Sequence, residues 1–183
     1  MLRCYAMIGL IMMCLTTTTR AQSGGGNDVP VKATLADRLR TTDYWAIGAQ
    51  YGLLGGTGLT LHYSMANRFS VELTGGYITL GDGMWSVGAE AQYLLDHGSD
   101  NRLYALVGAG NYHVGTVDSA GVISNNLSHP FRLGLGVGYE YFLSHKASIA
   151  AELPVVIFLP RQGGRAEVYP FPQLQFLYYF TID

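Results

Sequence analysis

Polar side chains that could carry out hydrolysis gather around one loop in the second half of the chain. His113, Asp118, Ser128 and His129 flank the longest loop that the sequence predicts. A serine near a histidine and a carboxylate is the composition of a nucleophilic hydrolase site. No sequence motif joins these four residues, and polar residues are also ordinary in surface loops. A hydrolytic site is therefore only an alternative to a plain loop at this place.

The sequence contains no motif for a metal or a cofactor. The five histidines show no pairing at metal-ligand spacing. Gly108-Ala109-Gly110 and Gly134-Leu135-Gly136 each contain two glycines of a phosphate loop, but neither continues into a third glycine or a helix. We therefore expect no metal and no cofactor. The formal net charge of −2, without a basic patch, likewise gives no support to nucleic-acid binding.

The ionisable residues fall on one face of the expected strands. In residues 131–142, large apolar side chains alternate with glycines, and this period of two is typical of a strand. Arg132 and Glu140 lie on the glycine side of that strand. The same alternation in other segments predicts a polar cluster on the face opposite the large apolar residues: His62, Glu72, Glu90, Arg132, Glu140 and Glu152.

Eight alternating segments follow one another from residue 43 onward. They cover residues 44–51, 59–65, 69–79, 85–93, 102–115, 131–142, 149–157 and 169–182. The connections after the second, fourth and sixth segments are short, and those after the fifth and seventh are the longest. Pro154 lies inside the seventh segment, where we expect a β-bulge because proline cannot donate to a strand ladder.

Composition favours a membrane barrel over a soluble one. The chain has 183 residues, of which 49% are apolar and only 13% charged, about half of the ~25% charged residues of a typical soluble domain. Facing water, the polar side of these strands would carry too few charges for good solubility. Enclosed in a narrow barrel, the same side chains would fill the lumen while the apolar side faces lipid. We therefore predict an all-β fold, an eight-stranded antiparallel up-and-down transmembrane β-barrel.

Two further features follow from that barrel. Eight strands leave an interior wide enough only for side chains. We therefore expect the lumen to be closed by a hydrogen-bonded cluster in which His62, Arg68 and nearby tyrosines or glutamines compensate the glutamates. The alternative is that water fills the gaps between these residues. Aromatic residues near the strand ends suit girdles at the two membrane interfaces. The predicted girdle residues are Trp45, Tyr63, Tyr77, Trp85, Tyr93, Tyr104, Tyr112, Tyr141 and Tyr178.

The first 42 residues differ in composition from the strands. Residues 1–21 have the positive start, short apolar core and small final residue of a secretory signal peptide. Cys4 and Cys14 both lie inside it, so the mature chain would have no thiol chemistry. Residues 22–42 form a leader that is glycine-rich at its start, and its helical stripe of apolar residues predicts a short helix, at the barrel mouth or merely leading in.

The number, length and parity of the strands in residues 43–183 resemble the barrel domain of small eight-stranded outer-membrane proteins of the OmpA/OmpX type. The resemblance implies export through the cleaved signal peptide, an outer-membrane location, contact with outer-membrane lipid and insertion by the barrel-assembly machinery. One departure concerns the family's terminal aromatic assembly signal, because Phe180 is followed by Thr181-Ile182-Asp183.

The leading hypothesis is a non-enzymatic structural or interaction protein of the outer membrane whose external loops, residues 116–130 and 160–169, meet partners or ligands. The external-loop candidates are His113, Asp118, Ser128, His129, Arg161 and Arg165. Two alternatives remain open. Small outer-membrane barrels that remodel lipid A or phospholipid place serine and histidine at the outer rim, which would make this protein a lipid hydrolase or acyltransferase. The other alternative is a barrel that binds a small solute or ligand.

Overall fold

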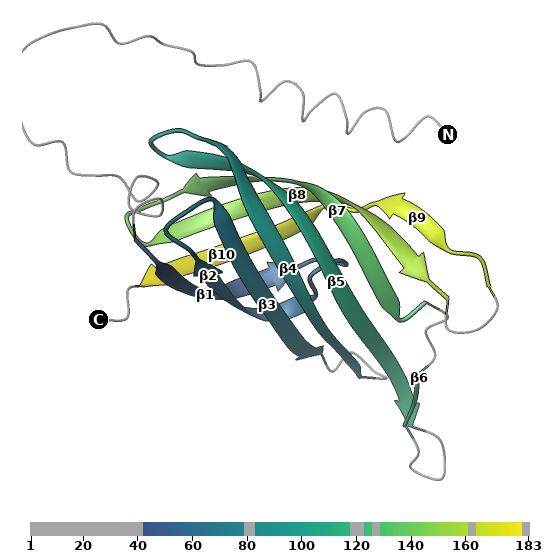
Figure 1. The fold of residues 1–183 in the computed structure, drawn as a ribbon. Coiled ribbons are helices and arrows are strands. Elements are labelled where there is room, and N and C mark those ends of the chain that lie inside the picture. Colours follow the sequence, from purple (N-terminus) through teal and green to yellow (C-terminus); the bar gives the residue numbers. More distant parts are fainter. Residues whose placement is uncertain (1–41, 79–82, 118–122, 126–128, 161–163, 181–183) are drawn as a thin grey trace, which may run out of the picture. The chain divides into compact units, whose positions relative to one another are not determined.

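The alternating segments form long antiparallel strands in the computed structural model of the protein, which describes residues 42–78, 83–117, 123–125, 129–160 and 164–180 (Figure 1). The eight long strands are β1 (Tyr44–Tyr51), β2 (Thr57–Ser64), β3 (Phe69–Ile78), β4 (Met84–His97), β5 (Asn101–Val117), β7 (Phe131–Phe142), β8 (Ala147–Leu159) and β10 (Gln173–Phe180). Two short strands, β6 (Ile123–Asn125) and β9 (Glu167–Pro170), complete the sheet.

The long strands close into a barrel. Each pairs antiparallel with its neighbour in the order β1-β2-β3-β4-β5-β7-β8, and β10 pairs with both β8 and β1. The register between the last and first strands runs from Trp45 opposite Phe180 to Tyr51 opposite Leu174. Closure removes the free edges that an open sheet would present. The predicted eight-stranded antiparallel barrel is therefore confirmed.

The two ends of the barrel differ in the length of their connections. Residues 65–68, 98–100 and 143–146 make three short turns at one end, as predicted. At the other end β5 extends past the predicted residue 115 and pairs through Gly115–Val117 with β6. β9 pairs with β8 alone among the described strands, so β8 and β9 also form an extension at this end (Figure 1).

Pro154 does not cause the expected bulge. Its register with Gly136 on β7 is part of an unbroken ladder, and the shift in the described sheet lies instead on β4, between Leu94 and Asp96. The effect of Pro154 appears on the side of β8 that faces β9 and β10. There the predicted strand 169–182 divides into β9 and β10, although Phe171 still donates its N–H to the carbonyl of Pro154 at 3.0 Å. Pro154 has no N–H to return that bond, so the ladder is interrupted at this pair.

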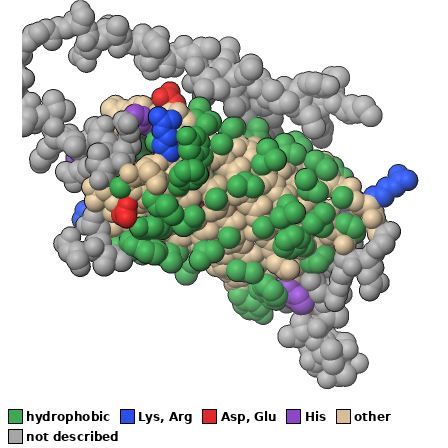
Figure 2. Space-filling model, viewed as in Figure 1, with side chains coloured by type: hydrophobic (Ala, Val, Ile, Leu, Met, Phe, Trp, Pro, Cys, Tyr) green, Lys and Arg blue, Asp and Glu red, His purple; other side chains and the backbone are tan. Residues whose placement is uncertain are grey.

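The barrel turns its apolar side chains outward. On β7, Leu135 is 65% exposed, whereas Arg132 is 7% and Glu140 0% exposed. On the face shown in Figure 2, hydrophobic side chains cover the middle of the barrel and charged ones gather towards its two ends. This is the reverse of a soluble sheet and matches a wall that faces lipid.

The leader and its predicted signal peptide, residues 1–41, lie outside the described residues, as do residues 181–183 after the last aromatic. In the described parts of the chain, no helix is long and apolar enough to cross a membrane.

Candidate functional site

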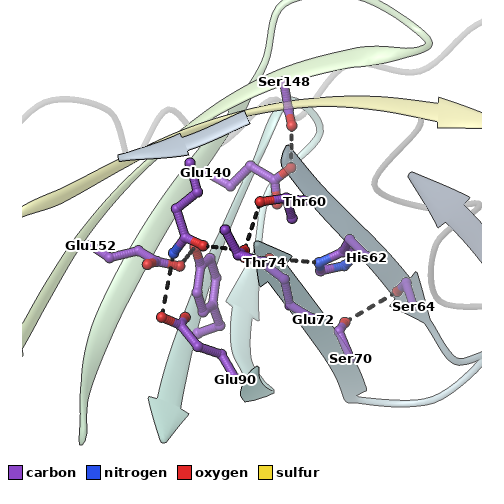
Figure 3. A network of polar contacts seen from close by, with 12 residues as sticks. Thr60, His62, Ser64, Ser70, Glu72, Thr74, Glu90, Glu140, Ser148 and Glu152 are labelled. Carbon is purple, nitrogen blue, oxygen red and sulfur yellow. Dashed lines mark hydrogen bonds and ion pairs between the residues drawn. The ribbon is translucent and has the colours of Figure 1, made fainter. Parts of the chain in front are cut away.

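The interior of the barrel is lined by side chains that alternate with the lipid-facing ones. All six residues of the predicted polar cluster are buried there, with exposed fractions of 7% or less. His62, Glu72 and Glu90 are consecutive neighbours across β2, β3 and β4, because His62 stands opposite Glu72 and Glu72 opposite Glu90. Figure 3 shows them converging with Glu140 and Glu152 on one network.

Glu140 is the most fully bonded carboxylate of the network. The guanidinium of Arg102 forms an ion pair with Glu140, the Ser148 hydroxyl donates to the same carboxylate, and Tyr179 donates to it at 2.7 Å. Arg102 also donates to the Tyr179 hydroxyl at 3.1 Å and lies 3.5 Å from Nε2 of His62. Glu140 is thus compensated by one cation and two neutral donors, which is what a buried carboxylate requires.

His62 connects this ion pair to the next carboxylate. Its Nδ1 lies 3.2 Å from Oε2 of Glu72, and its Nε2 faces the Arg102 guanidinium, which has no acceptor atom. The arrangement fits the neutral tautomer in which Nδ1 carries the proton and donates to Glu72, and Nε2 accepts from Arg102. The imidazole of His62 therefore contacts Glu72 directly and is linked to Glu140 through Arg102.

Gln173 holds the other two glutamates together. Its side-chain amide nitrogen donates to Glu90 at 2.9 Å and to Glu152 at 2.7 Å. Tyr104 donates to the second oxygen of Glu152 at 2.7 Å, and Gln50 to Glu90 at 3.3 Å. The hydrogen-bond donors described here for these two carboxylates, Gln50, Tyr104 and Gln173, are all neutral, so neither carboxylate shares the charge compensation that Arg102 gives to Glu140.

The connection between β1 and β2 turns into the lumen and forms a plug, defined here as residues 52–56. Leu54 is 0% exposed and packs with Tyr104, Leu106 and Val156. The sequence alone places this segment only in the connection between the alternating segments 44–51 and 59–65, where its glycines suit a turn. The apolar pair Leu53-Leu54 next to those glycines was the signal for a buried segment.

The strands around the plug leave room for it by lacking side chains. A Cβ atom at Gly134 would lie 3.0 Å from a methyl carbon of Leu54, and one at Gly108 would lie 3.2 Å from its Cγ. Positions 88 and 110 are also glycine, and a Cβ there would meet the plug backbone. The period-two glycines on the inner face are thus explained in part by close approach of this segment.

Side chains from the wall bind the polar backbone of the plug. The Tyr112 hydroxyl donates to the carbonyl of Gly52, and the Thr57 hydroxyl donates to the same carbonyl at 2.9 Å. Leu54 donates its N–H to Oε1 of Gln173 at 2.9 Å. Buried backbone groups need such partners, so the inner wall is chemically matched to the segment that fills it.

Most of the predicted aromatic girdle lies on the outside of the barrel. Trp45 packs on Tyr63 with ring centroids 4.7 Å apart, near the end that carries the short turns. The other outward members are Tyr77, Trp85, Tyr93, Tyr141 and Tyr178, with exposed fractions from 39% to 67%.

Tyr104 and Tyr112 were wrongly assigned to the girdle. They are 2% and 1% exposed and lie in the lumen. They do share a face with Leu106, as predicted, but that face is the inner one. Strand β5 has small residues on both parities around Gly108 and Gly110, so hydropathy did not distinguish its faces. The physical reason for the inward placement is hydrogen bonding, because both hydroxyls have buried acceptors.

The predicted compensation by Arg68 is also wrong. Arg68 is exposed on the turn between β2 and β3, whereas the arginine that enters the network is Arg102. The ladder places Arg102 directly opposite Glu140. Placing the short turns 98–100, before β5, and 143–146, after β7, at the same end of the barrel would have brought this pair together, since neighbours across an antiparallel sheet on one face are in contact.

The external-loop candidates are only partly described. His113 stacks on Trp85 with ring centroids 5.4 Å apart. Nε2 of His129 lies 3.3 Å from the carbonyl oxygen of Arg165. The segments that precede β7 and β9 are therefore in contact. Asp118, Ser128 and Arg161 lie outside the described residues.

Ser148 is a buried serine of the lumen that takes part in the polar network. The Ser148 hydroxyl donates to Glu140 rather than to a histidine. Within the described ranges, no set of three or more histidine, cysteine, aspartate or glutamate side chains could hold a metal ion. What the arrangement can do is fix eight strands around a bonded, filled interior.

Comparisons with known proteins concern the fold. No family model and no curated protein matches the sequence. Among solved structures, the chain is similar to the N-terminal β-barrel domain of Pseudomonas aeruginosa OprF, with 12% identity, a TM-score of 0.52, and coverage of 77% of this chain and 98% of that one. The fold is that of a small outer-membrane barrel.

Two further structures show weaker likeness. Ail, the attachment invasion locus protein of Yersinia pestis, has 15% identity and a TM-score of 0.47, over 76% of this chain and 99% of that one. Neisserial surface protein A has 17% identity and a TM-score of 0.35, over 75% and 91% of the two chains. At such identities the likeness describes architecture, so function has to be argued from the residues of this chain.

Proposed function

We propose that this protein is a non-enzymatic structural and interaction protein of the outer membrane, with a closed lumen and an external end that contacts partners or ligands. The observation that supports this most strongly is the filled interior. Four glutamates, Arg102 and His62 are bonded to one another or to neutral donors, and the plug occupies the space above them. A barrel filled in this way gives solutes no wide path.

The external end supplies the contact surface in this proposal. The extension formed by β8 and β9 carries Val168 and Tyr169, which are 55% and 53% exposed. All four residues of β9 are exposed, and the strand has β8 as its described partner on one side. Exposed apolar and aromatic residues on a projecting element are typical of a protein contact surface.

Membrane fractionation with a heat-modifiability gel tests the membrane part of the proposal. The folded barrel should remain with outer membranes and migrate differently before and after boiling. Planar-bilayer recordings should show no steady conductance of porin size. Recovery of the unmodified protein in the soluble fraction, or a porin-sized conductance, would contradict the proposal.

Site-specific photo-crosslinking tests the interaction part. A photoreactive residue in place of Tyr169 should give crosslinks to another envelope component in intact cells. The same residue in place of Tyr141, which is 46% exposed near the short-turn end, is the matched control and should react with lipid only. Equal patterns from the two positions would argue against a contact role for the β8–β9 extension.

A further inference from the structure

The lumen contains two arginines that are equally buried but differently compensated. Arg102 and Arg132 are both 7% exposed. Arg102 is paired with Glu140, whereas no carboxylate of the described residues lies within ion-pair distance of Arg132. Removing a cation from water without a counter-charge is costly. The position of Arg132 therefore needs an explanation that Arg102 does not.

The immediate contacts of Arg132 explain its orientation. Its guanidinium carbon lies 3.7 Å from the ring centroid of Tyr112 and 5.0 Å from that of Phe158. Nη1 donates to the carbonyl of Leu53 in the plug at 3.4 Å, close to the limit of a hydrogen bond. These contacts hold the side chain over the plug at the external end of the lumen.

The same contacts leave part of the guanidinium available. Aromatic rings interact with the flat faces of a guanidinium, while its N–H donors point outward in the plane. Nε of Arg132 is buried and has no hydrogen-bond partner. A buried cation with an unused in-plane donor is arranged to receive an oxyanion, since carboxylate and phosphate oxygens fit the donor fork of arginine.

The surroundings of Arg132 are apolar on the side of the plug. Phe158 and Phe171 are partly buried and pack against the cluster of Leu54 and Val156. Beside them the strand is interrupted between β9 and β10, and the plug, which follows the end of β1 at Tyr51, lies in the lumen. A ligand held by Arg132 could thus place an apolar part on Phe158 and Phe171.

We propose that Arg132 is the anchor of a binding site for an amphiphilic oxyanion at the external end of the lumen. The ligand class is a carboxylate or phosphate headgroup with a short apolar chain. The headgroup accepts from Nε of Arg132, and the chain lies against the exposed edges of Phe158 and Phe171. Tyr112 keeps the guanidinium in the orientation that this requires.

Titration of the purified full-length barrel in a nonionic detergent tests the site. Octanoate, octanol and inorganic phosphate separate the contributions of head and chain. Octanoate should bind about tenfold or more tightly than octanol, the order expected for one charge-assisted hydrogen bond, and should shift the NMR signal of the Arg132 Nε–H. Phosphate should bind more weakly than octanoate but shift the same signal.

Substitutions complete the test. Arg132→Met should remove the preference for octanoate over octanol, and Arg132→Lys should keep part of it because the charge remains. Arg68→Met, which changes an exposed arginine on a short turn, is the matched control and should bind like the wild type. Heat modifiability shows whether each variant is folded.

Two results would overturn the proposal. The first is equal binding of octanoate and octanol by the wild type, and the second is unchanged octanoate binding by a folded Arg132→Met variant. Phosphate that binds as tightly as octanoate would overturn the apolar half of the site and leave an anion site alone.

Discussion

Leu54 donates its backbone N–H to Oε1 of Gln173 at 2.9 Å, across 119 residues of sequence. Because this bond uses the amide oxygen of Gln173, the amide nitrogen is directed to the opposite side, where it donates to Glu90 and Glu152. The plug therefore orients the group that joins two carboxylates. Packing of the plug at the end opposite the short turns and hydrogen bonding in the middle of the lumen therefore form one connected structure.

Replacing the plug side chain should weaken the barrel. Leu54→Ala removes a fully buried side chain from the cluster with Leu106 and Val156, and we expect a loss of about 2–4 kcal/mol in the free energy of unfolding. Urea unfolding in lipid vesicles measures it. Leu59→Ala, at a lipid-facing position that is 78% exposed, is the control and should cost clearly less. Equal losses would mean that Leu54 is not packed inside.

Gln173 offers a test of the carboxylate bridge by exchange of groups. Gln173→Glu removes the two donated bonds and adds a third acidic group beside Glu90 and Glu152, so it should destabilise by about 2–5 kcal/mol. Adding Glu90→Gln to that variant returns the number of carboxylates to its original value. The double variant should recover part of the loss in urea unfolding. Simple additivity of the two single effects would show that the residues do not interact.

The ion pair of Arg102 and Glu140 should be the most sensitive contact in the lumen. Arg102→Met leaves a buried carboxylate without its cation, which typically costs about 3–5 kcal/mol. Arg68→Met at the exposed turn is the matched control. The second variant, Arg102→Met with Glu140→Gln, removes both charges and should be more stable than Arg102→Met alone. If Arg102→Met were at least as stable as the double variant, the Arg102–Glu140 ion pair would not be what stabilises the barrel.

Much of this fold could be predicted because period-two alternation is a local property of the sequence. The faces of β7 and the inward placement of Glu72, Glu90 and Glu152 follow from parity alone. At the last strand, β10, the same alternation indicates two further inward residues. Gln173 alternates with Leu174 and Tyr179 with Tyr178, so both could have been assigned to the lumen from the sequence.

Other features could not be read from alternation. The faces of β5 are ambiguous because glycines and alanines lie on both parities, and this concealed the inward positions of Arg102, Tyr104 and Tyr112. The plug is set by the space inside the closed barrel, which exists only after the strands have paired. Its glycines suit a turn outside the barrel as well as a segment inside it, so only Leu53 and Leu54 carried a signal.

The lipid-facing assignment of β7 can be tested with one charge. Leu135 is 65% exposed between two inward glycines, and Leu135→Arg puts a charge against lipid at a cost of about 2–4 kcal/mol near mid-membrane. Reversible unfolding in vesicles measures the loss. Leu143→Arg, on the short turn after β7, is the control and should cost much less. A Leu135→Arg barrel as stable as the wild type would mean that this face does not meet lipid.

Asp43 should give the barrel a distinct dependence on acid at its short-turn end. The carboxylate accepts the Tyr63 hydroxyl and the Ala66 N–H, each at 2.6 Å. The hydrogen bond from Tyr63, and then that from Ala66, lowers the pKa of Asp43 below its ordinary value. The unfolded chain lacks these bonds, so it binds the proton more tightly than the folded chain does. The stabilisation is present above the ordinary aspartate pKa of about 3.9 and is lost as pH falls through the lowered folded value.

Asp43→Asn should therefore remove part of the fall in stability that begins as the pH drops below about 4, the ordinary aspartate pKa. The measurement is the urea midpoint of the wild type and the variant at several pH values, compared as a difference so that the lumen carboxylates cancel. Tyr63→Phe removes the hydrogen bond that lowers the pKa of Asp43 most, so it should reproduce most of the change. Tyr93→Phe, on the same girdle, should not. Parallel pH curves for the wild type and Asp43→Asn would show that Asp43 does not contribute to acid sensitivity.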